Sequence, residues 1–413
     1  MKRRNFLAKS VLTTAGTMLI PNFLKAYERN QLGLGVVPST GKTLVMVQLS
    51  GGNDGLNTVV PYRNDIYYRE RPTLAIPAPN VLKINDEIGF NPALASLKSL
   101  YDDGLVTVIN NVGYPNPDRS HFRSMDIWQT ASGADQYLPT GWVGRYLDAA
   151  CAGAAPRQPY KAIEVDDTLS LVLKGNSLNG LAMLNPQKLF NQTQNGLVKG
   201  LANAHPAQPE GNATYLYKTL AETVSSAAYV YAKSARMARP VGTTNHTYPA
   251  TELGNRLKTV AELIQSGVGT SVYYISIAGF DTHINQAGQQ ERLLRHYAEA
   301  VKAFMDEMKA TNRHNDVLLM TFSEFGRRVK ENASRGTDHG TANSVFLVGG
   351  GLKPGQGGPG DLFNQAPDLT NLDDGDLRHT IDFRRIYATL LRQWLNANDV
   401  AILGRKFELL GLV

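Results

Sequence analysis

Residues 43–50, TLVMVQLS, run directly into residues 51–55, GGNDG. An almost continuous apolar run of this length is typical of a strand that is buried on both faces of a sheet. The glycines that follow allow the backbone to turn sharply and to approach a ligand closely. A buried strand that ends in a polar, glycine-rich turn predicts an α/β fold with a site at the strand's carboxyl end.

Further apolar runs show the same pattern, and each ends near polar residues: 105–111, 272–277, 317–322 and 344–348. Stretches with helical spacing of apolar residues lie among them, at 251–265, 289–309 and 383–394. Strands that alternate with helices predict a mostly parallel sheet sandwiched between helices. In such folds ligands bind at the carboxyl ends of the strands.

The middle of the chain has a different composition. Residues 191–210 and 238–249 are rich in proline, glycine and asparagine. We interpret residues 150–250 as a cap or insertion in a single domain that covers residues 27–413.

The net charge of the whole chain is +6, but residues 1–26 carry five basic side chains and no acid. The remainder therefore carries a net charge of about +1, and no basic stripe is left that would indicate nucleic-acid binding. The single cysteine, Cys151, cannot form a disulfide within the chain, and we expect a small buried side chain there.

The N-terminus resembles a twin-arginine translocation signal. Arg3 and Arg4 precede an apolar pair, and the apolar stretch that follows, residues 10–20, is too short to span a bilayer. Residues 1–26 are therefore predicted to direct export through the twin-arginine translocase to the periplasm or the extracellular space, without a stable membrane span. A basic amphipathic helix on the domain surface is the alternative interpretation.

Carboxylates and histidines gather at the predicted strand ends. The candidate ligands of a divalent metal are Asp54, Asp281, His283, Glu324 and His339. Each motif alone is commonly structural, but hard oxygens and imidazoles that converge at one sheet edge suit Zn²⁺ or Mn²⁺/Mg²⁺.

Ser120 stands before an amphipathic run that begins at residue 121. It can cap that helix, or it can act as a nucleophile at a helix N-terminus, where free amides stabilise an anion. Arg119, Arg123 and Arg327 are the candidates to hold the oxygens of an anionic ester.

The ordered motifs LSGGNDGLNTVVPY, SHFRSMDIWQT, GFDTH, TFSEFGRRV and GTDHGTAN resemble the exported family called domain of unknown function 1501. The likeness runs from the signal to about Leu391. That family is similar to the alkaline phosphatase and sulfatase superfamily, whose members cleave phosphate or sulfate esters with paired metals. The resemblance implies an alkaline phosphatase-like fold.

By motif order, the resemblance implies that Ser120 is the nucleophile and that Asp281, His283 and His339 bind a first metal. It places Asp54 as the ligand after the first strand and Glu324 as the acid of a second metal. Two features depart from the superfamily pattern: Phe325 stands where a histidine normally follows that acid, and Asp281 and His283 are closer together than usual.

Two functions follow from these observations. The first is an exported metal-dependent hydrolase that acts on a small-molecule or glycan ester of phosphate or sulfate. The second is a non-catalytic exported binding protein that reuses the fold. The departure at Phe325 favours the second.

Overall fold

The computed structural model describes residues 41–153, 157–203, 212–237, 247–353 and 361–413. The predicted signal, residues 1–26, lies outside the described residues, as do parts of the predicted insertion. None of the described helices is long and apolar enough to cross a bilayer.

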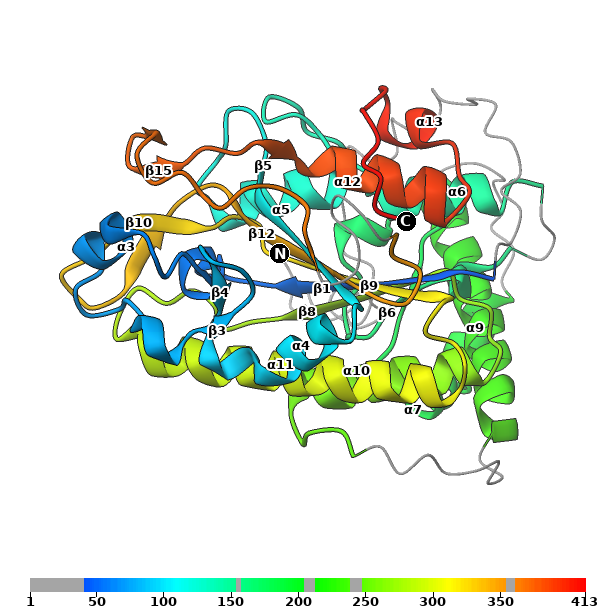
Figure 1. Cartoon of the computed structure of the whole chain (residues 1–413). Coiled ribbons are helices and arrows are strands. Elements are labelled where there is room, and N and C mark those ends of the chain that lie inside the picture. The colour runs from blue at the N-terminus through cyan, green and yellow to red at the C-terminus, as the bar shows by residue number, and fades with distance from the viewer. Residues whose placement is uncertain (1–40, 154–156, 204–211, 238–246, 354–360) are drawn as a thin grey trace, which may run out of the picture.

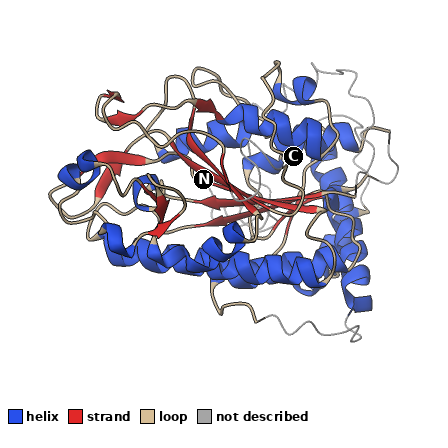
Figure 2. Cartoon of the chain, viewed as in Figure 1, coloured by secondary structure: helices blue, strands red, loops and turns tan. Residues whose placement is uncertain are grey.

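A central sheet runs through the middle of the molecule, with helices above and below it (Figures 1 and 2). Its strands lie in the order β13-β5-β12-β9-β1-β8-β6-β7, and β16 also pairs with β5. Their bounds are β1 Thr43–Leu49, β5 Val106–Gly113, β6 Ala162–Glu164, β7 Leu181–Ala182, β8 Val272–Ile277, β9 Val317–Phe322, β12 Asn343–Val348, β13 Asp361–Leu362 and β16 Ile381–Asp382.

The sheet is mostly parallel, as predicted. β1 lies between β8 and β9 and pairs parallel with both, so these three strands end at the same edge. β12 runs in the opposite direction, because it pairs antiparallel with β9 on one side and with β5 on the other. The predicted α/β fold, a mostly parallel sheet flanked by helices, is confirmed.

Side chains of β1 alternate between two cores. Val45, Val47 and Leu49 pack on the face covered by α4 (Ala95–Asp102), α10 (Glu252–Gln265) and α11 (Gln286–Ala310). Leu44 and Met46 pack on the other face, beneath α5 (His121–Thr130), α6 (Trp142–Ala150) and α12 (Phe383–Thr389). Burial on both faces explains why the run is continuously apolar instead of alternating.

The helices follow the predicted apolar spacing. The buried residues of α11 include Leu294, Tyr297, Val301 and Phe304, which recur every three or four positions and so share one face. Thr251 begins α10 by accepting a hydrogen bond from the backbone N–H of Gly254 at 3.1 Å. A π-helical turn, Leu390–Trp394, continues α12, and α13 (Asp399–Leu403) follows near the C-terminus.

The region predicted as an insertion contributes to the sheet as well as to its edge. β6 pairs with β8, and β7 extends the sheet by one further strand. The helices of this region are α7 (Pro186–Thr193), α8 (Gly196–Ala202) and α9 (Asn212–Met237), and α7 and α8 pack against α9.

Small elements surround the loops that follow the central strands. Among them are two-residue strands outside the central sheet: β2 (Val59–Val60), β3 (Leu82–Lys83), β4 (Gly89–Phe90), β14 (Leu372–Asp373) and β15 (Asp376–Leu377). The others are β10 (Arg327–Glu331), β11 (Thr337–His339) and the short helix α3 (Asp65–Glu70). β10 pairs with β11, which brings the segment after β9 back across the ends of the parallel strands.

Candidate metal centre

The loop after β1 is held close to the loops after β8 and β9. Gly51 has a φ of 119°, and a Cβ atom there would lie 2.4 Å from the backbone nitrogen of Asp281. Gly52 has a φ of 74°, and its Cβ would collide with the ring of Phe325. Both positions need glycine, because the backbone is left-handed and the neighbouring loops leave no space.

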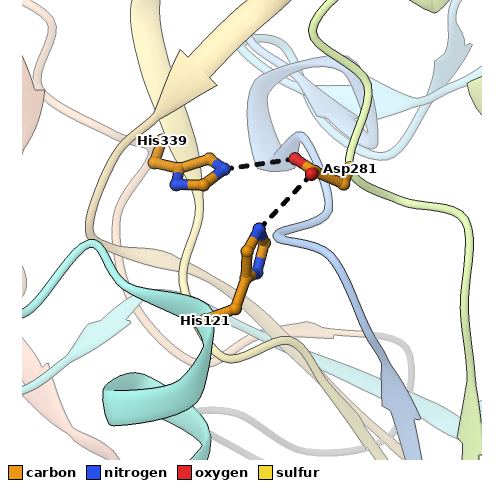
Figure 3. A group of neighbouring side chains, drawn as sticks. All are labelled: His121, Asp281 and His339. Carbon is orange, nitrogen blue, oxygen red and sulfur yellow. Dashed lines mark hydrogen bonds and ion pairs between the residues drawn. The ribbon is translucent and has the colours of Figure 1, made fainter.

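Three side chains from distant parts of the chain converge at this edge (Figure 3): His121, Asp281 and His339. Each offers one ligand atom, and these atoms all lie within 4.8 Å of one another. His121 is the first residue of α5, Asp281 follows β8, and His339 ends β11. The parallel topology thus places groups that are far apart in sequence around one point.

His283 joins the same group. Its Nε2 lies 3.0 Å from Oδ1 of Asp281 and 2.9 Å from Nε2 of His339. The His339 Nε2 lies 3.1 Å from the same carboxylate oxygen, and Nε2 of His121 lies 3.5 Å from Oδ2. Three imidazoles therefore present their Nε2 atoms to one carboxylate.

An acceptor stands behind each of the three rings. The Nδ1 of His121 is 2.9 Å from Oε1 of Glu324, and the Nδ1 of His339 is 2.8 Å from the backbone oxygen of Arg119. The Nδ1 of His283 faces the Asp338 carboxylate at 3.4 Å. An acceptor at Nδ1 favours the tautomer that carries its proton there, which leaves Nε2 as the nitrogen that can bind a metal.

This donor set fits a divalent cation. The Nε2 of His121 is buried and has no hydrogen-bond partner among the described residues, which is costly for a polar atom. The Nε2 atoms of His283 and His339 lie 2.9 Å apart, so two lone pairs would repel each other there. Either a proton on one nitrogen or a cation close to both removes this repulsion. Three imidazoles and one carboxylate are ligands typical of Zn²⁺.

Glu324 is buried behind His121 instead of facing the other predicted ligands. Its Oε1 accepts hydrogen bonds from the backbone N–H of Gly51 at 2.7 Å and from His121. The hydrogen bond with Glu324 raises the pKa of His121 above its ordinary value. Glu324 therefore orients the imidazole, as carboxylates behind metal-binding histidines do.

Arg327 is fully buried and joins the three loops. Its guanidinium donates to the backbone oxygens of Gly51 and Gly52, and its Nη2 lies 2.7 Å from Oδ1 of Asp281. Burial alone raises the pKa of Asp281, but the hydrogen bonds from Arg327 and His339 outweigh it and lower this pKa to about 2. Asp281 is therefore a carboxylate anion at neutral pH.

The structure does not bring Asp54 into this group. Its Oδ2 lies 2.5 Å from Nη1 of Arg71 and 2.5 Å from Nε2 of Gln286, and its Oδ1 accepts a bond from the backbone N–H of Asn57. Both members of the ion pair are buried. The carboxylate predicted as a metal ligand is thus neutralised by a guanidinium.

Ser120 is the N-cap residue of α5 and directly precedes His121. Its side chain does not cap the helix, and its hydroxyl has no hydrogen-bond partner among the residues that the structure describes. Arg123 lies in the first turn of the helix, but its Nη2 donates to backbone oxygens of Gly133, Ala134 and Gln136. The Ser120 hydroxyl is therefore not used to cap the helix, whereas Arg123 holds a loop.

His121 is not among the ligands predicted from the sequence, although it lies in the motif SHFRSMDIWQT next to Ser120. A histidine at the first position of a helix is its one signal in the sequence, because its partners Glu324 and Asp281 are too distant along the chain to be recognised from spacing.

A cavity of about 620 Å³ adjoins the centre. Its wall includes Arg119, Glu324 and Phe325, which also contact the histidines. Asp374, Arg378 and other residues of the 373–379 segment also line it. The cavity therefore shares a wall with the group of imidazoles and combines polar and aromatic side chains.

The fold and the geometry of this site define a mixed α/β protein with a candidate metal centre at the carboxyl edge of its sheet. The family model described as "Protein of unknown function (DUF1501)" matches residues 41–389, and the chain belongs to this family. The resemblance identified from the sequence motifs is thereby confirmed. No curated protein sequence matches the chain.

Solved structures with some similarity include a periplasmic domain, EcEptC from Escherichia coli in complex with Zn, at 12% identity, TM-score 0.37 and 77% coverage of both chains. A protein in the alkaline phosphatase superfamily from Vibrio parahaemolyticus has 10% identity and a TM-score of 0.41, with 98% of this chain and 78% of that chain covered. The PsFucS1 sulfatase from Pseudoalteromonas sp. has 11% identity and a TM-score of 0.39, with coverages of 95% and 75%. At these TM-scores the likeness carries no argument about chemistry.

Proposed function

We propose that this protein is an exported metal-dependent hydrolase of phosphate or sulfate esters, with Ser120 as its nucleophile. The observation that carries the proposal is the buried Nε2 of His121, which has no hydrogen-bond partner among the described residues and faces, at 3.5 Å, the same carboxylate as two further imidazoles. The residues that would hold the metal are His121, Asp281, His283 and His339. Their nitrogen-rich set favours Zn²⁺ over Mn²⁺ or Mg²⁺.

A bound divalent ion would polarise an ester oxygen and stabilise the charge that develops on it. The protein's own residues supply the remaining parts. Ser120 has a free hydroxyl at the start of α5, where the first backbone N–H groups of the helix point toward an incoming anion. Ser120 directly precedes the candidate ligand His121 in the chain, which supports its assignment as the nucleophile.

The reaction would proceed in two steps. The Ser120 Oγ forms a bond to phosphorus or sulfur and releases its proton to solvent, while the ester oxygen leaves as an alcohol that takes up a proton. The oxygen of a water molecule then forms a bond to the phosphorus or sulfur, the bond to the Ser120 Oγ breaks, this Oγ takes up a proton, and inorganic phosphate or sulfate is released. The cavity that adjoins the centre would hold the remainder of a small-molecule or glycan substrate.

Arg327 and Arg123 take roles that differ from those predicted. Both guanidiniums already donate to protein oxygens, so neither is available to hold the oxygens of an ester. Arg327 instead positions Asp281. Arg119, which is partly exposed and pairs with Asp376 at the cavity, is the remaining candidate for contact with an anionic substrate.

Metal analysis followed by a panel of chromogenic phosphate and sulfate esters tests the proposal. Wild-type protein loaded with Zn²⁺ should hydrolyse at least one ester class, and Ser120→Ala should lower kcat by at least about a thousandfold. Ser225→Ala, an exposed serine on α9, is the matched control and should retain full activity. Folded, metal-loaded protein that hydrolyses none of the esters would favour the non-catalytic binding protein.

A further inference from the structure

We infer that this centre takes one divalent ion per chain, because two buried arginines neutralise the carboxylates that a second ion would need. The inference deepens the proposed function and rests on it. The arginines are Arg71, which pairs with Asp54, and Arg327, which pairs with Asp281.

Arg71 occupies the place that a cation would take beside Asp54. Besides the Asp54 carboxylate, its guanidinium donates to the side-chain oxygen of Asn57 and to the backbone oxygens of Val329 and Arg328, each at 2.8 Å. The side chains of Arg71 and Asp54 are 0% and 1% exposed. A metal ion could reach Asp54 only by displacing a guanidinium that has four acceptors in a dry environment, which is strongly unfavourable.

Arg327 restricts how many carboxylate oxygens of Asp281 are available to a metal ion. The Nη2 of Arg327 donates to Oδ1 of Asp281 at 2.7 Å, whereas Oδ2 lies 3.5 Å from Nε2 of His121. One oxygen of the carboxylate is therefore committed to a fixed cation, and the other remains for an ion held by the imidazoles. Two ions bridged by both oxygens of Asp281 would require Arg327 to move away from the backbone oxygens that it binds.

The two ion pairs belong to one network. Gln286 donates to Asp54 and accepts from the Thr337 hydroxyl at 2.6 Å, and the backbone oxygen of Thr337 accepts from Arg327 at 2.8 Å. Each polar group in this hydrogen-bond network has a partner. Neither arginine can therefore shift without breaking hydrogen bonds that connect it to the other. The arrangement is therefore fixed.

The balance of charge agrees with a single ion. The carboxylates of this network are Asp54, Asp281, Glu324 and Asp338, and its guanidiniums are Arg71 and Arg327, so these six groups carry four negative and two positive charges, a net formal charge of −2. One divalent ion would balance this charge. A second divalent ion would leave two uncompensated positive charges in a largely desolvated region.

Titration of the metal-free, full-length protein with Co²⁺ tests this inference, with visible absorption as the readout and elemental analysis of the dialysed complex as a check. Wild type should reach its endpoint at one ion per chain. The double variant Asp54→Asn/Arg71→Met removes both charges of the pair together, so it should also bind one ion, with a Kd within about threefold of wild type. Asp281→Asn should weaken binding by at least about tenfold.

Two ions in wild type, one of which is lost in the double variant, would overturn the inference and leave the proposed hydrolysis intact. One ion without hydrolysis of any ester supports the inference and overturns the proposed reaction. Failure of folded wild type to bind any ion overturns both.

Discussion

Arg71→Met is the substitution whose effect on stability can be derived most fully from the structure. It removes the guanidinium from Asp54 and leaves a buried carboxylate with only Gln286 and the backbone N–H of Asn57 as donors. Breaking a buried ion pair from one side costs about 3–5 kcal/mol, because the remaining charge stays desolvated and unpaired. We therefore expect the free energy of unfolding to fall by about that amount.

Urea denaturation followed by circular dichroism measures this change. Arg295→Met is the matched control, because Arg295 pairs with Glu291 on the exposed side of α11 and its loss should cost at most about 1 kcal/mol. Adding Asp54→Asn to Arg71→Met should recover part of the lost stability, since the group left behind is neutral. A cost below about 1 kcal/mol for Arg71→Met would refute the claim that this pair is desolvated and charged.

Further expected outcomes concern pH, the glycine turn and export. Burial raises the pKa of Glu164 to about 7, so the folded state keeps this proton while the unfolded state loses it near pH 4.5. The stability that this group contributes is present at low pH and is lost as the pH rises through 7. Urea titrations should therefore show a fall of about 3 kcal/mol in the free energy of unfolding, and Glu164→Gln should largely remove this fall. An equal fall in wild type and in the variant would contradict the prediction. Gly51→Ala should weaken the binding of Co²⁺ in a titration, because the added Cβ would collide with the backbone of Asp281. Gly288→Ala on α11 is the control and should leave binding unchanged, because the space around it is open. Replacing Arg3 and Arg4 by lysine should keep the protein in the cytoplasm on cell fractionation, and unchanged export would exclude the twin-arginine route.

The central strands could be predicted from the sequence because a strand that is buried on both faces is continuously apolar. The run that became β1 and the runs at 272–277 and 317–322 are continuously apolar, and the structure places strands there. The direction of β12 could not be predicted, because a strand buried on both faces has the same composition whether it runs parallel or antiparallel. The short strands β6 and β7 lacked any comparable run.

Some of the candidate ligands could be selected from the sequence because they follow strands directly. Asp281, His283 and His339 were identified from their position after strands or near them, and the structure brings them together. Asp54 fulfils the same criterion, but its charge is neutralised by Arg71, and pairing across a fold is not visible in sequence spacing. His121 faces the centre because α5 begins beside the loops after β8 and β9, which only the three-dimensional arrangement reveals.

Anomalous X-ray diffraction at the zinc edge, from crystals of Zn²⁺-loaded protein, would locate the ion that the imidazoles are proposed to hold. We expect one strong peak within bonding distance of the Nε2 atoms of His121, His283 and His339 and of the Asp281 carboxylate, and none beside Asp54. A Zn²⁺-saturated crystal with no peak among these imidazoles, or with its peak at Asp54, would show that the metal centre is not built from these residues.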